Sequence, residues 1–191
     1  MNDFIVVSYY TEGTYYAAEA LRLSASLVFH KIPSNIEGIE SRGDWYKNTQ
    51  YKPKFLLQMM YQFPDKDIVW VDCDAEFLSY PYLFEHLMGP LSVHVLDHRK
   101  RDVNREPELL SGTIFIKNSA EARRIIEAWA SECSSTAQIW DQRALAAVIG
   151  DKFEKLPAEY CTIYDTMSYI KSPVIKHYQA SRRFRKTRSL V

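Results

Sequence analysis

The chain has 191 residues, which suits one compact domain of about 100–200 residues, so we expect a single domain spanning residues 1–191. Its composition, 47% hydrophobic and 25% charged, excludes a disordered chain, and only 6 glycines and 8 prolines exclude a collagen-like or linker-like sequence. No apolar run approaches the ~20 residues of a membrane span and the first residues do not resemble a secretory signal, so we expect a cytoplasmic protein. Three widely spaced cysteines indicate neither a disulfide framework nor a zinc cluster.

The formal net charge of zero conceals an asymmetry between the body of the chain and its end. From Lys171 to Val191 there are seven basic residues and no acidic one, and five of the seven fall between Arg182 and Arg188. The first 170 residues therefore carry 17 basic against 24 acidic side chains. A basic C-terminal tail over residues 182–191 predicts contact with phosphates or with an acidic surface.

Strands and helices are predicted in alternation along the chain, from apolar β-branched runs and from helical spacing of apolar residues. The strands are expected at Phe4–Val7, Ile68–Val71, Leu91–Leu96, Gly112–Lys117 and Pro173–Tyr178. The helices are expected at Tyr15–Phe29, Pro53–Phe63, Ala120–Cys133 and Gln138–Ile149. Between them Lys31–Asn48 is expected to be a loop, with a short strand possible around Ile36 and Ile39. The pattern predicts an α/β fold with a mostly parallel, Rossmann-like sheet flanked by helices, in which ligands bind at the carboxyl ends of the strands.

An acidic pair, Asp72-Cys73-Asp74, directly follows the strand IVWV. Two carboxylates at the end of a buried strand repel one another and lose hydration, and a hard divalent cation such as Mg²⁺ or Mn²⁺ relieves both costs. The alternative is a structural role, in which a carboxylate caps a following helix. A second acidic pair, Asp65-Lys66-Asp67, precedes the strand and is expected to be a solvated turn.

The stretch KPKFLLQMMYQFPDKDIVWVDCDAEFL, from Lys52 to Leu78, resembles the core of nucleotide-sugar glycosyltransferases of GT-A fold. In those families a Lys-Pro or Pro-Lys helix start precedes a strand that ends in an Asp-x-Asp motif. Three more segments follow in the order of the family: LSGTIFIKN at 110–118, WDQRAL at 140–145 and IKHYQASRRFR at 175–185.

The resemblance implies transfer of a sugar from a nucleoside-diphosphate sugar, with a UDP-sugar favoured, to an acceptor hydroxyl. It implies Mn²⁺ or Mg²⁺ held by Asp72, Asp74 and His177, with the metal bridging Asp72, Asp74 or both to the diphosphate. Further donor contacts are expected from the residues after the first strand and from basic side chains: Tyr9, Tyr10, Thr11, Lys54, Lys176, Arg182 and Arg183. Each of these residues has a plainer interpretation as a core or solvated side chain.

On the acceptor side, Asp141 is the candidate for a catalytic carboxylate that removes the acceptor proton, and Gln142 for positioning hydroxyls. Asp141 could instead serve only as a helix cap. Gly112 would let the acceptor approach the backbone, or is merely a glycine at the start of a strand. The loop at 97–105, with charges of both signs, could form part of an acceptor rim.

Two other functions compete with glycosyl transfer. A haloacid-dehalogenase-like phosphatase also uses an Asp-x-Asp at a strand end, but Glu76 stands where that motif has Thr or Val. A non-catalytic nucleic-acid-binding module is suggested by the basic tail, although the acidic body opposes a broad DNA footprint. The two ideas combine in a transferase that modifies DNA bases, as some phage enzymes do. The acceptor therefore stays open among a glycan, a lipid-linked saccharide and a modified DNA base.

Overall fold

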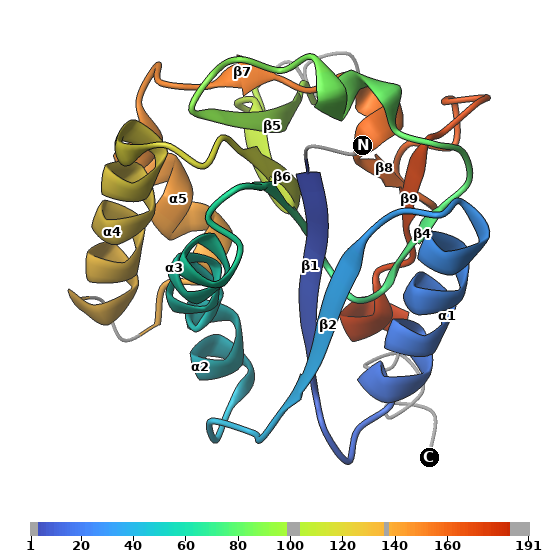
Figure 1. The fold of residues 1–191 in the computed structure, drawn as a ribbon, viewed down its shortest axis with the longest axis horizontal. Coiled ribbons are helices and arrows are strands. Elements are labelled where there is room, and N and C mark those ends of the chain that lie inside the picture. Colours follow the sequence, from blue (N-terminus) through green and yellow to red (C-terminus); the bar gives the residue numbers. More distant parts are fainter. Residues whose placement is uncertain (1–3, 99–103, 136–137, 184–191) are drawn as a thin grey trace.

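A central sheet of six strands forms the middle of the molecule in the computed structural model, which describes residues 4–98, 104–135 and 138–183 (Figure 1). The strands lie in the order β2-β1-β3-β6-β5-β7. All neighbouring pairs are parallel except those of β6, which is antiparallel to both β3 and β5. Their bounds are β1 Phe4–Thr11, β2 Ser34–Ile39, β3 Asp67–Val71, β5 Leu91–Leu96, β6 Glu108–Ile116 and β7 Glu154–Lys155. The sheet is therefore mostly parallel, as predicted.

Other elements cover both faces of this sheet, because the side chains on both sides of the central strands are apolar. In β1, Ile5 and Val7 pack with the helices of one face, whereas Phe4 and Val6 pack with those of the other. The first face carries α3 (Lys52–Gln62), α4 (Ala120–Ser135) and α5 (Asp141–Ile149), with α2 (Trp45–Gln50) beside them. The second face carries α1 (Tyr16–Phe29) and a small second sheet.

The second sheet has three short strands in the order β4-β9-β8, with bounds β4 Ala75–Phe77, β8 Thr162–Ile163 and β9 Ile175–His177. Strand β4 pairs antiparallel with β9, and the register sets Ala75 opposite His177. This pairing brings the segment around His177 beside the acidic pair, which lies about 100 residues earlier in the sequence. Two single-turn 3-10 helices, η1 (Tyr82–Glu85) and η2 (Ala158–Tyr160), complete the elements of the described residues.

Most of the predicted elements are present, with shifted ends. Strand β1 continues to Thr11, so Tyr9, Tyr10 and Thr11 belong to the strand and not to the turn after it. Gly112 lies inside β6 and not at its start. The segment expected to be a loop holds β2 and also α2, which begins with an Asp44 carboxylate that accepts a hydrogen bond from the Lys47 backbone N–H. No helix among the described residues is long and apolar enough to cross a membrane.

A substitution at Phe115, on β6, tests how much the core between the sheet and α1 contributes to stability. Its ring is fully buried and stacks on Phe84 with ring centroids 6.0 Å apart. Replacing Phe115 by Ala leaves a cavity, and we expect the free energy of unfolding to fall by about 3–5 kcal/mol in urea titrations. The exposed Tyr61→Ala is the control and should change it by less than about 0.5 kcal/mol. Equal effects of the two substitutions would contradict this description of the core.

Candidate active site

The acidic pair, Asp72 and Asp74, lies directly after the end of β3 and beside the middle of β6. The Asp72 backbone N–H donates to the Gly112 carbonyl at 2.8 Å, which fixes the chain directly after β3 against the antiparallel β6. The Ala75 N–H then donates to the Asp72 carbonyl at 3.0 Å and closes a turn that leads into β4. This turn presents both carboxylates at the carboxyl end of a parallel strand, the position predicted for ligand chemistry.

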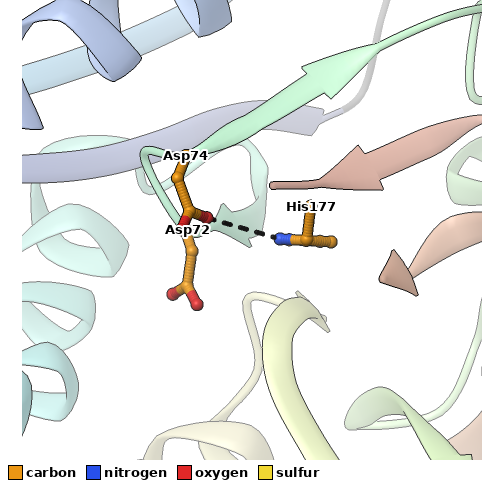
Figure 2. Close-up of side chains that lie close together, drawn as sticks. All are labelled: Asp72, Asp74 and His177. Carbon is orange, nitrogen blue, oxygen red and sulfur yellow. Dashed lines mark ion pairs between the residues drawn. The ribbon is translucent and has the colours of Figure 1, made fainter. Parts of the chain in front are cut away.

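Asp72, Asp74 and His177 form the candidate metal group (Figure 2). One ligand atom from each of the three side chains lies within 4.8 Å of the others, and Asp74 Oδ1 is 4.0 Å from His177 Nδ1. The other oxygen of Asp74 accepts a hydrogen bond from the Ala180 N–H at 2.7 Å. His177 Nε2 lies 2.8 Å from Thr113 Oγ1, and this contact orients the imidazole so that Nδ1 faces the Asp74 carboxylate.

The protonation states in this group suit a cation. Burial lowers the pKa of His177 to about 4, so the imidazole is neutral and able to ligate at neutral pH. Burial, followed by the nearby Asp72 charge, raises the pKa of Asp74 to about 6. Two carboxylates and a neutral imidazole are a donor set that fits Mn²⁺ or Mg²⁺, and a positive charge there would relieve the electrostatic cost of Asp74.

Gly112 makes room for the imidazole. A Cβ at this position would lie 3.1 Å from His177 Cε1 and 3.3 Å from Nδ1, closer than ordinary packing allows. Gly112 is not among the residues that line the cleft described below. Close packing against His177 therefore accounts for a glycine at this position.

Lys52 is a central residue that the sequence analysis missed. Its side chain is buried, and Nζ lies 2.6 Å from Asp141 Oδ2, 3.0 Å from Asp72 Oδ1 and 3.2 Å from the carbonyl oxygen of Ser111. Burial alone would lower the pKa of Lys52, but the carboxylates of Asp141 and Asp72 together raise it above its ordinary value. Lys52 is thus a buried cation that ties together the two sides of the site.

Lys54, the lysine chosen from the sequence, is exposed and does not line the cleft. Two residues along a helix turn the side chain by about 200°, so Lys52 and Lys54 point in nearly opposite directions. The spacing of Lys52, Phe55, Leu56 and Met59 on the buried side of α3 was the signal that could have identified Lys52 as the buried lysine.

Asp141 begins α5 and is nearly completely buried. Its Oδ2 accepts a hydrogen bond from Ser111 Oγ at 2.9 Å in addition to the Lys52 ion pair, and its backbone carbonyl accepts from Trp129 Nε1 at 2.8 Å. Gln142 accepts from the Ser111 N–H at 3.2 Å and donates to Glu108 at 2.8 Å. Glu108, which the sequence analysis did not single out, also contacts His98 and Arg105 at 2.9 and 3.0 Å.

A cleft of about 370 Å³ opens above these groups. Eight of the predicted site residues line it: Tyr9, Tyr10, Thr11, Asp72, Asp74, Asp141, Gln142 and Arg182. Five do not line it: Lys54, Gly112, Lys176, His177 and Arg183. Aromatic side chains that were not predicted contribute to its walls: Tyr16, Trp45, Trp70 and Trp140. His98 and Arg105, at the two ends of the predicted rim loop, also line the cleft, while residues 99–103 lie outside the described residues.

The basic side chains predicted to contact the diphosphate differ in their surroundings. Arg182 is exposed and lines the cleft. Arg183 forms an ion pair with Glu19 of α1, which also pairs with Arg22. Lys176 lies over the Tyr178 ring, 5.4 Å from its centroid, on the side of β9 opposite His177. The remaining basic residues of the tail, from position 184 onward, lie outside the described residues.

Comparison with solved structures places this fold among glycosyltransferases. The chain is similar to a glycosyltransferase involved in the glycosylation of the major capsid of PBCV-1, with 15% identity, a TM-score of 0.71, and coverage of 98% of this chain and 100% of that one. It is also similar to the galactosyltransferase LgtC, crystallised with donor and acceptor sugar analogs (9% identity, TM-score 0.61, 98% and 96% coverage). A third similar structure is glycosyltransferase GlyE of Streptococcus pneumoniae TIGR4, of which the chain spans 55% (14% identity, TM-score 0.54, 93% of this chain). No protein-family model and no curated protein sequence matches the chain. At these identities, the similarity establishes the fold.

Lys52→Met tests the buried ion pairs. Removing the ammonium leaves the nearly buried Asp141 without its cation, so we expect the free energy of unfolding to fall by about 3 kcal/mol. Lys54→Met, two residues away on the exposed side of α3, should change it by less than about 0.5 kcal/mol. Urea titrations of both variants make the comparison, and equal stabilities would contradict a bridging role for Lys52.

The substitution Asp74→Asn tests the raised pKa of the Asp74 carboxyl in metal-free protein. Because the pKa of Asp74 is raised from 3.8 to about 6, the folded state binds more protons than the unfolded state between these pH values. The contribution of Asp74 to stability is therefore complete below pH 3.8 and is lost as pH rises through about 6. In EDTA, the unfolding free energy of the wild type should fall relative to Asp74→Asn by about 2 kcal/mol over this range. The lowered pKa of His177 acts in the opposite direction but is present in both proteins. Parallel pH profiles would contradict the assignment.

Proposed function

We propose that the chain is a metal-dependent glycosyltransferase that moves a sugar from a nucleoside-diphosphate sugar to an acceptor hydroxyl. The observation that carries the proposal is the Asp72, Asp74 and His177 group, which lies at the end of β3 beside a cleft, in a fold shared with glycosyltransferases. A divalent cation bound there would supply positive charge to the diphosphate as the bond between sugar and phosphate breaks.

In this proposal the chain's own residues divide the cleft between donor and acceptor. Tyr10, Thr11 and Tyr16 lie at the end of β1 and the start of α1, where they would contact the nucleotide. Arg182 would place a further cation beside the departing diphosphate. The Tyr9 hydroxyl donates to the Asn48 carbonyl at 2.6 Å, so Tyr9 would support the wall of the cleft more than it would bind ligand directly.

Asp141 and Gln142 are the proposed acceptor-side residues. The Lys52 ion pair and the hydrogen bond from the Ser111 hydroxyl hold the Asp141 carboxylate in one orientation, as a positioned general base requires. Gln142 and Glu108 are joined by a hydrogen bond on the same side of the cleft, where their remaining polar atoms would orient acceptor hydroxyls.

We favour a saccharide as the acceptor over a DNA base. The similar PBCV-1 protein takes part in glycosylation of a capsid, and the LgtC structure contains an acceptor sugar analog. The phosphatase alternative has less support, because the similar solved structures are glycosyltransferases and Glu76 stands where the phosphatase motif has Thr or Val.

A thermal-shift screen of nucleoside diphosphates and their sugars, with and without Mn²⁺, tests the proposal. We expect a metal-dependent rise in melting temperature with one nucleotide, UDP being favoured, because a ligand that binds only the native state stabilises it. Asp74→Ala should abolish both the rise and metal-dependent donor hydrolysis. Asp65→Ala, at the exposed residue of the second acidic pair, should retain both. The other residue of that pair, Asp67, is not in a solvated turn as expected: it begins β3 and pairs with Lys117 at 2.9 Å. Unchanged donor hydrolysis in Asp74→Ala would refute the metal assignment.

A further inference from the structure

Two partly exposed tryptophans, Trp45 and Trp140, lie together in the wall of the cleft. The chain has four tryptophans, and the other two, Trp70 and Trp129, are 2% and 0% exposed and donate their indole N–H groups to residues of the candidate site. Burial and hydrogen bonding account for that second pair. Trp45 and Trp140 belong to none of the hydrophobic clusters that the described residues form, so core packing does not account for them.

The two indole rings meet at a corner. Their centroids are 6.0 Å apart and their planes are inclined at 81°. The guanidinium carbon of Arg143 lies 5.1 Å from the centroid of the Trp140 ring, and Arg143 does not line the cleft. The surface of Trp140 that faces the cleft is therefore not the one beneath this cation. We call the two rings the aromatic corner and define it as Trp45 and Trp140.

Contacts with neighbouring elements fix the aromatic corner in place. Trp45 is the first residue of α2, and Trp140 immediately precedes α5. At the end of α2, Gln50 Nε2 donates to the Ile139 carbonyl at 2.8 Å, which ties together two segments 89 positions apart in the sequence. The Tyr9 hydroxyl donates to a carbonyl of α2 at 2.6 Å and anchors this helix to β1. Rings held in this way lose little freedom when a ligand binds.

Hydrogen-bonding side chains adjoin the aromatic corner. The two residues that follow Trp140 are Asp141 and Gln142, and Gln142 donates to Glu108 at 2.8 Å. All of these side chains line the cleft. A pyranose ring has C–H groups on its faces and hydroxyls around its edge, so it is bound well by an aromatic surface with carboxylate and amide groups beside it. The aromatic corner and its neighbours provide this combination.

We propose that the aromatic corner docks a pyranose ring of the acceptor, so that Trp45 and Trp140 determine which acceptors are used. The inference rests on the proposed function, because only glycosyl transfer makes the docked saccharide an acceptor. It names a substrate class: saccharides with an unsubstituted C–H face, whose edge hydroxyls would then lie near Asp141. A nucleobase would also stack on an indole, but it carries no ring of hydroxyls for the carboxylates beside the corner.

The experiment is saturation-transfer NMR of the full chain with methyl β-D-galactopyranoside, methyl β-D-glucopyranoside and methyl α-D-mannopyranoside, each with and without UDP and Mg²⁺. We expect saturation to reach at least one pyranoside, most strongly at the C–H protons of one ring face, because the indole protons border that face. Sorbitol, which has similar hydroxyls but no ring, should receive little saturation.

Variants test the two rings separately. Trp45→Ala and Trp140→Ala should each raise the dissociation constant of the bound pyranoside at least about tenfold. Trp140→Phe keeps an aromatic ring and should stay within about threefold of the wild type. The matched control is Tyr82→Ala, which removes one ring of another exposed aromatic pair, Tyr80 and Tyr82, outside the cleft. It should bind within about twofold of the wild type. Circular dichroism checks that each variant is folded.

Several outcomes would overturn the inference. No saturation of any of the three pyranosides, with or without nucleotide, would do so. Equal weakening in Tyr82→Ala would do the same, and so would wild-type affinity in Trp140→Leu, which keeps apolar bulk but no aromatic face. Saturation of adenosine in place of the pyranosides, lost in Trp140→Ala, would assign the aromatic corner to a nucleobase.

The thermal-shift screen of nucleotides separates this inference from the proposed function. A metal-dependent shift with a nucleotide, but no binding of any pyranoside, would refute only the docking of the acceptor on the aromatic corner. Binding of a pyranoside that depends on Trp45 and Trp140, without a response to any nucleotide, would refute only the transferase activity.

Discussion

Compensation of buried negative charge is the constraint on which the rest of the site depends. Asp72, Asp74 and Asp141 converge near the end of β3. The side chains of Asp74 and Asp141 are only 14% and 8% exposed, and carboxylates so placed need cations or protons nearby. Lys52 supplies one permanent charge between Asp141 and the more exposed Asp72. Burial, followed by the Asp72 charge, raises the pKa of Asp74. A divalent cation beside the neutral His177 would stabilise the ionised form of Asp74. The same electrostatic requirement thus underlies the arrangement of the site and the proposed metal chemistry.

The antiparallel strand β6 makes this convergence possible. If both neighbours of β3 were parallel to it, the residues beside Asp72 would come from the end of another strand. Here the middle of β6 lies beside the end of β3, and consecutive residues of β6 contact different side chains of the site. Ser111 contacts Lys52 and Asp141, Gly112 makes room for His177, and Thr113 holds its imidazole. One short stretch thereby positions both the candidate metal group and the ion pair between Lys52 and Asp141.

The parts of the molecule with strong local patterns could be predicted from the sequence. Apolar runs at β1, β3 and β5 and the periodicity of α1 and α4 identify those elements, and the acidic pair identifies the strand end. Strands β4, β7 and β8 have only two or three residues each, too few for a periodic signal. The buried position of Lys52 was not predicted, because a sequence position alone does not show which side of a helix faces a cluster distant in sequence. The roles of Glu19 and Glu108 depend on partners distant in sequence, Arg183 and Gln142, and were not predicted.

The short pairing of β4 with β9 has a consequence for the order of folding. It joins positions 75 and 177, and the candidate metal group is incomplete until this long-range contact forms. Closing so long a loop is entropically slow compared with forming the helices and the local β5–β6 hairpin. During synthesis the two aspartates emerge about 100 residues before the histidine, so a cation that needs all three side chains would bind only near the end of folding. Metal binding would then act as a final checkpoint that distinguishes a completed domain from a partly folded one.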